Sequence, residues 1–143
     1  MATLLVDDRE QWTVARTLEE RGGFEVEQQR LETGDILNRD LDAIAERKTF
    51  QDALDVDRLF AQVDRMNEEF THSALVVHGQ RIDSIKADIK GGHANATRQV
   101  MGTIAYVQET TDTHVIWLPG EATKWGMIQL AEYLRIWYNQ LSP

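Results

Sequence analysis

The chain has 143 residues, of which 42% are hydrophobic and 27% charged, as expected of one globular domain with its own hydrophobic core. It contains no cysteine and no apolar run of about twenty residues, which excludes a disulfide framework, a thiolate metal site and a membrane-spanning helix. The net charge of −9 argues against a simple basic surface for nucleic acid. The N-terminus lacks the basic region of a secretory signal, so we expect an intracellular, cytoplasmic protein.

The spacing of apolar residues predicts alternating strands and helices. In chain order, we expect strand 4–6, helix 11–21, edge strand 24–28, strands 36–37 and 41–48 joined by a turn at 38–40, helices 49–54 and 56–70, strand 74–77, a polar helix or loop over 80–90, helix 94–109, strand 114–118 and helix 122–140. The apolar sides of the helices before the last carry Trp12, Ala15, Leu18, Leu59, Phe60, Val63, Met66, Phe70, Val100, Ile104 and Val107. The order βαβββααβααβα is typical of an α/β fold with a mixed central β-sheet flanked by α-helices.

The predicted hairpin brings acidic and basic side chains together. Side chains alternate along a strand, so Glu46 and Lys48 share one face while Arg47 points to the other. If Asp35 lies across from Glu46, their carboxylates converge on one point. Hard cations such as Mg²⁺ take oxygen ligands and use one or two protein carboxylates, completed by water and substrate phosphate.

A lysine beside such a cluster can orient or polarise an attacking water. Two carboxylates and a lysine are therefore the minimum apparatus for metal-assisted hydrolysis of a phosphodiester. The alternative is a set of ordinary surface charges on a solvated hairpin. Spacing alone leaves both interpretations open.

Four ordered blocks favour the catalytic interpretation: Val6-Asp7-Asp8-Arg9-Glu10, Gly34-Asp35, Glu46-Arg47-Lys48 and Asp52. In order and spacing they resemble the VDxRE, GD and ERKxxxD pattern of the XPF-type structure-specific endonucleases, within the restriction-endonuclease-like (PD-D/E-XK) superfamily. Arg58 and Gln62, one helical turn apart, resemble the Arg and Gln of that family's next helix. The resemblance covers roughly residues 3–80 with motifs and the remainder only in pattern.

The resemblance implies a role for each residue of the hairpin. Asp35 and Glu46 would hold Mg²⁺ or Mn²⁺, with the backbone carbonyl of Arg47 as a third oxygen ligand. Lys48 would position or polarise the attacking water. Asp7 ends the first predicted strand, where open α/β sheets place ligands, and would bind a second metal directly or through water.

Four side chains have two interpretations each. Arg9 and Glu10 would belong to the same cleft or form a charge cluster at a helix entrance, which the helix dipole favours for Glu10. Asp52 would orient Arg47, Lys48 or Arg9, or it would cap the following helix. The Arg47 side chain would bind a supporting carboxylate within the site or form a purely structural ion pair.

Contacts to DNA have a separate set of candidates. Arg58 and Gln62 share one helix face and either touch phosphate oxygens or form an exposed polar face. The segment 80–98 is net basic and is either a DNA-contacting loop or a solvated linker. The DNA-binding candidates are Arg58, Gln62, Lys86, Lys90 and Arg98.

The last predicted helix is more apolar than one buried face requires. Its core-packing face would carry Trp125, Ile128, Leu134, Trp137, Tyr138 and Leu141, with Met127, Leu130 and Tyr133 beside it. Exposed apolar surface often marks an interface. Together with the resemblance, this predicts a homodimer or heterodimer formed through the C-terminal half.

We therefore expect residues 1–143 to form a single nuclease domain that cuts branched, flap or fork DNA and leaves 5′-phosphate and 3′-hydroxyl ends, in the cytoplasm or at the nucleoid. The sequence departs from the family in having no helix-hairpin-helix module and in His78, where many members carry an acidic residue. The alternative is a catalytically inactive DNA-binding or scaffold subunit of a nuclease complex. A third hypothesis is an unrelated α/β domain whose matches are accidental.

Overall fold

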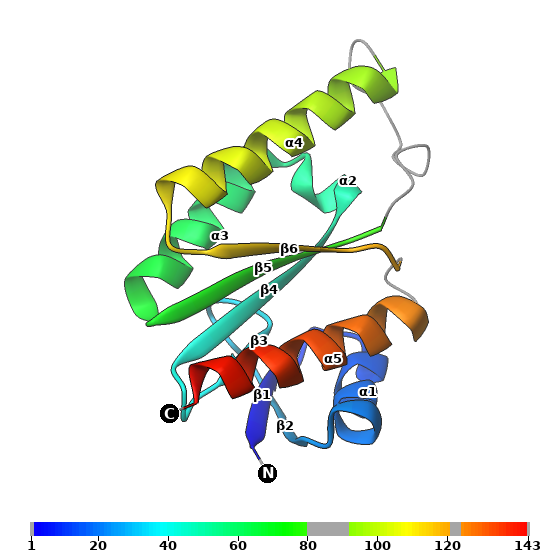
Figure 1. The fold of residues 1–143 in the computed structure, drawn as a ribbon, viewed down its shortest axis with the longest axis vertical. Helices are drawn as coiled ribbons and strands as arrows, with labels where there is room; N and C mark the ends of the chain where they lie inside the picture. The colour runs from blue at the N-terminus through cyan, green and yellow to red at the C-terminus, as the bar shows by residue number, and fades with distance from the viewer. Residues whose placement is uncertain (1, 80–91, 121–123, 143) are drawn as a thin grey trace.

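The computed structural model describes residues 2–79, 92–120 and 124–142 (Figure 1). The strands are β1 (Thr3–Asp7), β2 (Glu25–Gln29), β3 (Ile36–Asn38), β4 (Ala43–Thr49), β5 (His72–His78) and β6 (His114–Leu118). The helices are α1 (Trp12–Gly22), α2 (Phe50–Ala53), α3 (Val56–Glu69), α4 (Gly92–Thr110) and α5 (Lys124–Leu141). The polar helix or loop predicted over 80–90 lies outside the described residues.

The strands form one mixed sheet in the order β2-β1-β3-β4-β5-β6. β3 pairs antiparallel with both of its neighbours, and the other neighbouring strands are parallel. Helices α1 and α5 cover one face of the sheet, and α2, α3 and α4 cover the other (Figure 1). This arrangement confirms the predicted mixed sheet flanked by helices, with β2 as an edge strand.

Each face of the sheet has its own hydrophobic core because side chains alternate along the strands. On β4, Ala43 and Ala45 belong to the cluster beneath α1 and α5, whereas Ile44 belongs to the cluster beneath α2, α3 and α4. This alternation continues into the polar end of β4. It directs Glu46 and Lys48 toward one layer of helices and Arg47 toward the other.

The hairpin turn is longer than predicted, and β4 begins at Ala43 rather than at residue 41. Leu41 donates its N–H to the side chain of Asn38 over 3.2 Å, and Asp42 adopts a left-handed φ of 52°. The Asp42 carboxylate also accepts bonds from Thr71 at 2.9 and 2.7 Å, immediately before β5. These polar bonds favour a turn through residue 42 over two further strand residues.

Two tryptophans predicted to be buried are exposed. The side chains of Trp12 and Trp125 are 64% and 70% exposed, whereas Met127 and Leu130 are buried. On α5, the buried face starts at Met127 and repeats at intervals of three and four residues. Trp125 lies two residues earlier, which is a rotation of about 200° around the helix, so it points away from that face. The prediction assigned these side chains to the wrong sides because contact with α1 determines how α5 is rotated.

The remaining apolar helix positions agree better with the prediction. Leu59, Val63 and Met66 of α3 are buried, as are Val100 and Val107 of α4. Phe60, Phe70 and Ile104 are half-buried at the margin of the same cluster. Among the helices in the described part of the chain, none combines the length and apolar character that a membrane crossing requires.

Candidate functional site

A cleft of about 390 Å³ opens where β1 and β4 end and β3 begins. Its lining residues are Asp7, Arg9, Glu10, Glu32, Thr33, Gly34, Asp35, Glu46, Arg47, Lys48, Arg58, Gln62 and Arg65. The cleft thus brings together every predicted catalytic residue except Asp52. It also contains Arg58 and Gln62 from the set of DNA-binding candidates.

Backbone hydrogen bonds fix Asp35 between two strands. Its N–H donates to the carbonyl of Ala45 over 2.9 Å, and its own carbonyl accepts from Asp7 over 2.8 Å. Ile36 pairs with Ala45, so Asp35 falls opposite Glu46. The Asp35 carboxylate, which lines the cleft, accepts the N–H of Arg47 over 2.7 Å.

Gly34 is required by both its backbone angle and its surroundings. Its φ is +78°, in the left-handed region that disfavours side chains. A Cβ at this position would overlap the side chain of Ile44, which is fully buried. The Gly-Asp pair therefore lets the chain pass closely over β4 and places the carboxylate at the edge of the sheet.

Glu46 and Lys48 are both buried at the floor of the cleft, 5% and 8% exposed. The Lys48 Nζ lies 3.4 Å from Glu46 Oε1. Burial and the neighbouring Asp35 carboxylate raise the pKa of Glu46 to about 8, although Lys48 opposes this shift. Asp35 and Glu46 therefore lie together in a poorly hydrated part of the cleft, where a second negative charge is unfavourable.

This donor set fits a divalent cation. Both side chains offer hard oxygen ligands, and a cation would offset the repulsion that raises the pKa of Glu46. Gln62 Oε1 is also buried at this cleft without a hydrogen-bond partner in the described structure. Among residues 2–79, 92–120 and 124–142, no group of three or more His, Asp or Glu side chains is placed to hold a metal ion.

The Arg47 side chain lies on the other face of β4, as the alternation predicts. Its Nη1 forms a 2.5 Å ion pair with Glu10, and its Nε donates to Nε2 of His78 over 3.3 Å. Burial and the charge of Asp35 raise the pKa of Glu10 to about 7, against the opposing charge of Arg47. Glu10 and His78 together hold the guanidinium in place.

Asp7 has protein partners for both carboxylate oxygens. It accepts from Arg9 Nε over 2.9 Å and from the N–H of Leu31 over 3.1 Å. Arg9 also donates to the carbonyl of Leu31 over 2.7 Å. These bonds tie the end of β1 to the loop before Gly34, and metal ligation by Asp7 stays a prediction.

Asp52 is the third residue of α2 and completes the capping box of that helix, whereas the following helix, α3, has Asp55 as its N-cap. The Asp52 carboxylate accepts the N–H of Thr49 over 3.2 Å, and the Thr49 hydroxyl accepts the N–H of Asp52 over the same distance. Asp52 lines a neighbouring depression that also contains Lys48 and His78. Its role in orienting the catalytic groups stays a prediction.

The DNA-binding candidates lie in different places. Arg58 and Gln62 line the cleft from α3, whereas Arg98 lines a separate groove with Asp55 and Asp57. Lys86 and Lys90 lie outside the described residues.

Sequence reasoning did not name Glu32, Thr33 or Arg65 as cleft residues, and it gave His78 no role in the site. Arg65 lines the cleft, and its spacing from Arg58 and Gln62 continues one helix face, a signal that the sequence carried. His78 reaches Arg47 because parallel pairing sets it beside Thr49. No local pattern reveals that pairing.

The central β3–β4 hairpin carries Asp35 at its start and the buried Glu-x-Lys sequence near the C-terminal end of β4. Together with the mixed six-stranded sheet, this arrangement defines a restriction-endonuclease-like fold. Residues 6–126 match the ERCC4 domain, and the chain belongs to this family. The family is one of structure-specific DNA nucleases, which confirms the predicted membership and shows that the hypothesis of an unrelated domain is wrong.

The fold is similar to two solved structures. One is XPF from Aeropyrum pernix, with 26% identity and a TM-score of 0.73 over 95% of this chain and 61% of that one. The other is the same protein in complex with DNA, with 24% identity and a TM-score of 0.74 over 98% and 66%. The chain thus spans less than two thirds of the length of each matched structure. A comparison with curated protein sequences finds no match.

Proposed function

We propose that this chain is a Mg²⁺- or Mn²⁺-dependent endonuclease that hydrolyses phosphodiester bonds in branched, flap or fork DNA and leaves 5′-phosphate and 3′-hydroxyl ends. One observation carries the proposal: Asp35, Glu46 and Lys48 meet at the floor of one cleft, and Arg58 and Arg65 line its wall. The complex of the Aeropyrum pernix XPF with DNA supports DNA as the substrate class.

The residues of the cleft divide the chemistry between them. Asp35 and Glu46 would hold the cation, which when bound supplies Lewis acidity and lowers the pKa of a bound water. The Arg47 N–H fixes the Asp35 carboxylate, and the Lys48 ammonium lies where it can orient the attacking water.

Phosphate recognition falls to α3. Arg58 and Arg65 are exposed on the face that lines the cleft, and guanidinium groups bind phosphate oxygens with paired hydrogen bonds. Five acidic and five basic residues line the cleft, so binding should be weak and strongly dependent on salt. A bound cation would tip this balance toward the DNA backbone.

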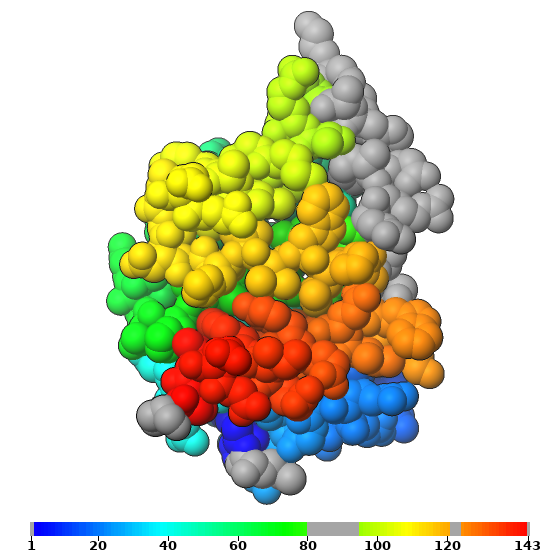
Figure 2. Space-filling model, in the orientation of Figure 1, coloured from blue at the N-terminus to red at the C-terminus, as the bar shows by residue number. Residues whose placement is uncertain are grey.

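We further propose a dimer through the C-terminal half. Helices α4 and α5 lie on one face of the molecule with β6 between them (Figure 2). Tyr106, Trp117 and Ile136 of these elements are 54%, 44% and 50% exposed. β6 is also an edge strand of the sheet, and its unpaired backbone groups offer a partner further bonds. Residues 1–143 would act as one nuclease domain within such a dimer.

The test is cleavage of labelled flap, fork, splayed-arm and blunt duplex DNA with Mg²⁺ or Mn²⁺ across a range of salt concentrations. Wild type is compared with Asp35→Ala and Lys48→Ala, and with Asp112→Ala, an exposed acidic residue in a different groove, as the matched control. Metal-dependent cutting that both site variants lose and the control keeps is the expected result. Binding without cutting under every condition would favour the inactive scaffold subunit instead.

A further inference from the structure

The exposure of Trp12 needs an explanation beyond the core. Trp12 is the first residue of α1, and its ring is 64% exposed, while the buried side of that helix consists of Val14, Ala15 and Leu18. Trp12 follows Glu10 of the candidate cleft by only two residues. A large aromatic surface left in water next to a functional cleft is a typical feature of a contact site.

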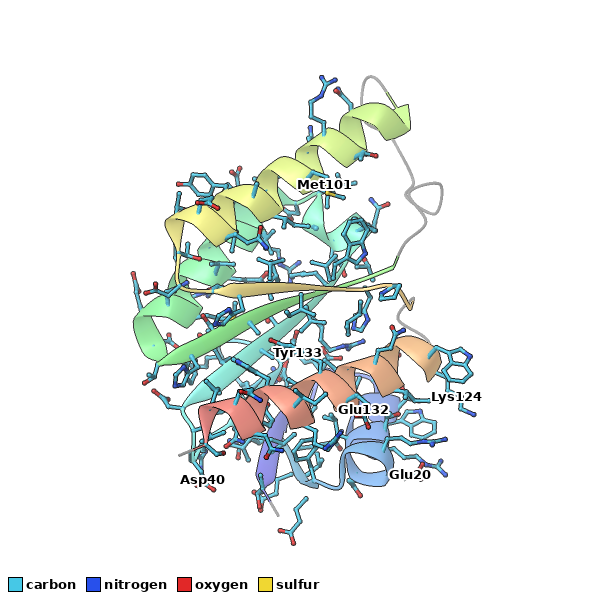
Figure 3. All side chains as sticks on the ribbon, viewed as in Figure 1. Glu20, Asp40, Met101, Lys124, Glu132 and Tyr133 are labelled. Atoms are coloured by element: carbon cyan, nitrogen blue, oxygen red, sulfur yellow. The ribbon has the colours of Figure 1, made fainter. Side chains whose placement is uncertain are left out.

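One basic group lies over the Trp12 ring, and a second lines the same groove. The guanidinium carbon of Arg16 lies 5.6 Å from the ring centroid, and Arg16 Nε is fixed by a 2.8 Å bond to Glu20. Trp12 and Arg16 line a groove of about 410 Å³ with Lys124, at the start of α5. Figure 3 shows Lys124 and Glu20 on the same side of the molecule. The groove therefore combines an aromatic face with two cations, Arg16 and Lys124, and one carboxylate, Glu20, which pairs with Arg16.

One depression separates the Trp12 groove from the candidate active site. A depression of about 280 Å³ next to the cleft shares Arg9, Glu10, Arg47 and Lys48 with it. The same depression shares Gln11 with the Trp12 groove. The cleft, the depression and the Trp12 groove therefore adjoin one another, with Gln11 between the last two.

We propose that Trp12, with Arg16 and Lys124, is a stacking platform for an unpaired base of the DNA strand that leaves the candidate cleft. This inference rests on the proposed function in taking DNA as the ligand. Every base has an aromatic face, so stacking on a tryptophan tolerates any sequence, and flanking cations follow the phosphates. Paired bases are stacked on their neighbours within the duplex, so the platform selects branched DNA with an unpaired arm.

The experiment measures binding in a chelator, where metal-dependent cleavage cannot interfere. A splayed-arm DNA with 2-aminopurine in one unpaired arm, and a blunt duplex, are titrated with wild type, Trp12→Ala and Trp12→Tyr. Trp125→Ala is the matched control, because that residue is 70% exposed but does not line the groove. We expect Trp12→Ala to weaken splayed-arm binding about tenfold and to abolish quenching of 2-aminopurine. Trp12→Tyr and Trp125→Ala should retain both signals, and blunt-duplex affinity should not change.

Several results would overturn the platform. One is that Trp12→Ala binds the splayed-arm DNA and quenches 2-aminopurine as strongly as wild type does. Another is that Trp12→Ala loses as much affinity for the blunt duplex as for the splayed-arm DNA. If Trp12→Ala instead reduces only self-association in sedimentation velocity, the groove is a protein-docking surface and the inference fails. Cleavage of the same DNA in Mn²⁺ separates the platform from the proposed nuclease activity. Quenching without cleavage supports the platform alone. Cleavage without any effect of Trp12→Ala on binding or quenching supports the nuclease alone.

Discussion

Replacing Gly34 by alanine should lower the free energy of unfolding by about 2–4 kcal/mol. Part of this cost is the backbone conformation, because φ is +78° and a Cβ there is unfavourable by about 1 kcal/mol or more. The rest is overpacking, because the new methyl group would overlap Cγ1 and Cδ1 of Ile44 and lie 3.5 Å from the carbonyl of Ala45. Ile44 is fully buried and has little freedom to move away.

Two other glycines separate these contributions in urea unfolding followed by tryptophan fluorescence. Gly23 has a φ of +70° but open space around its Cβ position, so Gly23→Ala should show the backbone cost alone. Gly102 lies within α4 with open space and no left-handed angle, so Gly102→Ala should stabilise the protein by up to about 1 kcal/mol.

The overpacking of Gly34→Ala should be partly relieved by Ile44→Val, because the smaller side chain removes Cδ1. The double variant should then be more stable than the sum of the two single effects predicts. If Gly34→Ala costs no more than Gly23→Ala, or if the two changes are additive, the close approach of the Gly-Asp turn to β4 is refuted.

Three further changes test other parts of the site. Burial and the charge of Arg47 lower the pKa of His78 from 6.5 to about 4. The contribution of the neutral imidazole to the free energy of unfolding is therefore complete above pH 6.5 and is lost as pH falls toward 4. His78→Gln should remove about 2 kcal/mol of this pH dependence in chelator, measured as the difference in unfolding free energy from wild type, and an unchanged profile would contradict the neutral buried imidazole. Arg58→Ala combined with Arg65→Ala should reduce the slope of log affinity against log salt by about 1–2, and an unchanged slope would place phosphate binding elsewhere. Asp52→Ala should lower the free energy of unfolding by about 1 kcal/mol through loss of the capping box, measured by thermal unfolding, and should leave cleavage per folded molecule nearly unchanged. A large loss of cleavage per folded molecule would show that Asp52 also orients the catalytic groups.

Local patterns were sufficient to predict the hairpin and the placement of its charged side chains. Alternation along β4 placed Glu46 and Lys48 on one face and Arg47 on the other, and the turn brought Asp35 opposite Glu46. The same periodicities predicted the mixed sheet and most of its helices. These features depend on residues that are close in sequence, whose geometry is set by strand and helix periods.

Contacts between distant elements were not predictable in this way. The exposure of Trp12 and Trp125 follows from how α1 and α5 pack against each other, and apolar spacing on either helix alone does not fix that rotation. The contact of His78 with Arg47 needs the parallel pairing of β4 and β5. The longer hairpin turn depends on bonds between Asp42 and Thr71, which are 29 residues apart.

Binding of Mn²⁺ is the measurement that tests the central claim most directly, because it needs neither DNA nor turnover. The electron paramagnetic resonance signal of free Mn²⁺ is followed as wild type, Asp35→Asn, Glu46→Gln and Asp112→Asn are added at neutral pH. We predict that wild type and Asp112→Asn bind the ion, whereas each site variant binds at least about tenfold more weakly. Equal binding by wild type and Asp35→Asn, or no binding by wild type, would contradict a cation site built on Asp35 and Glu46.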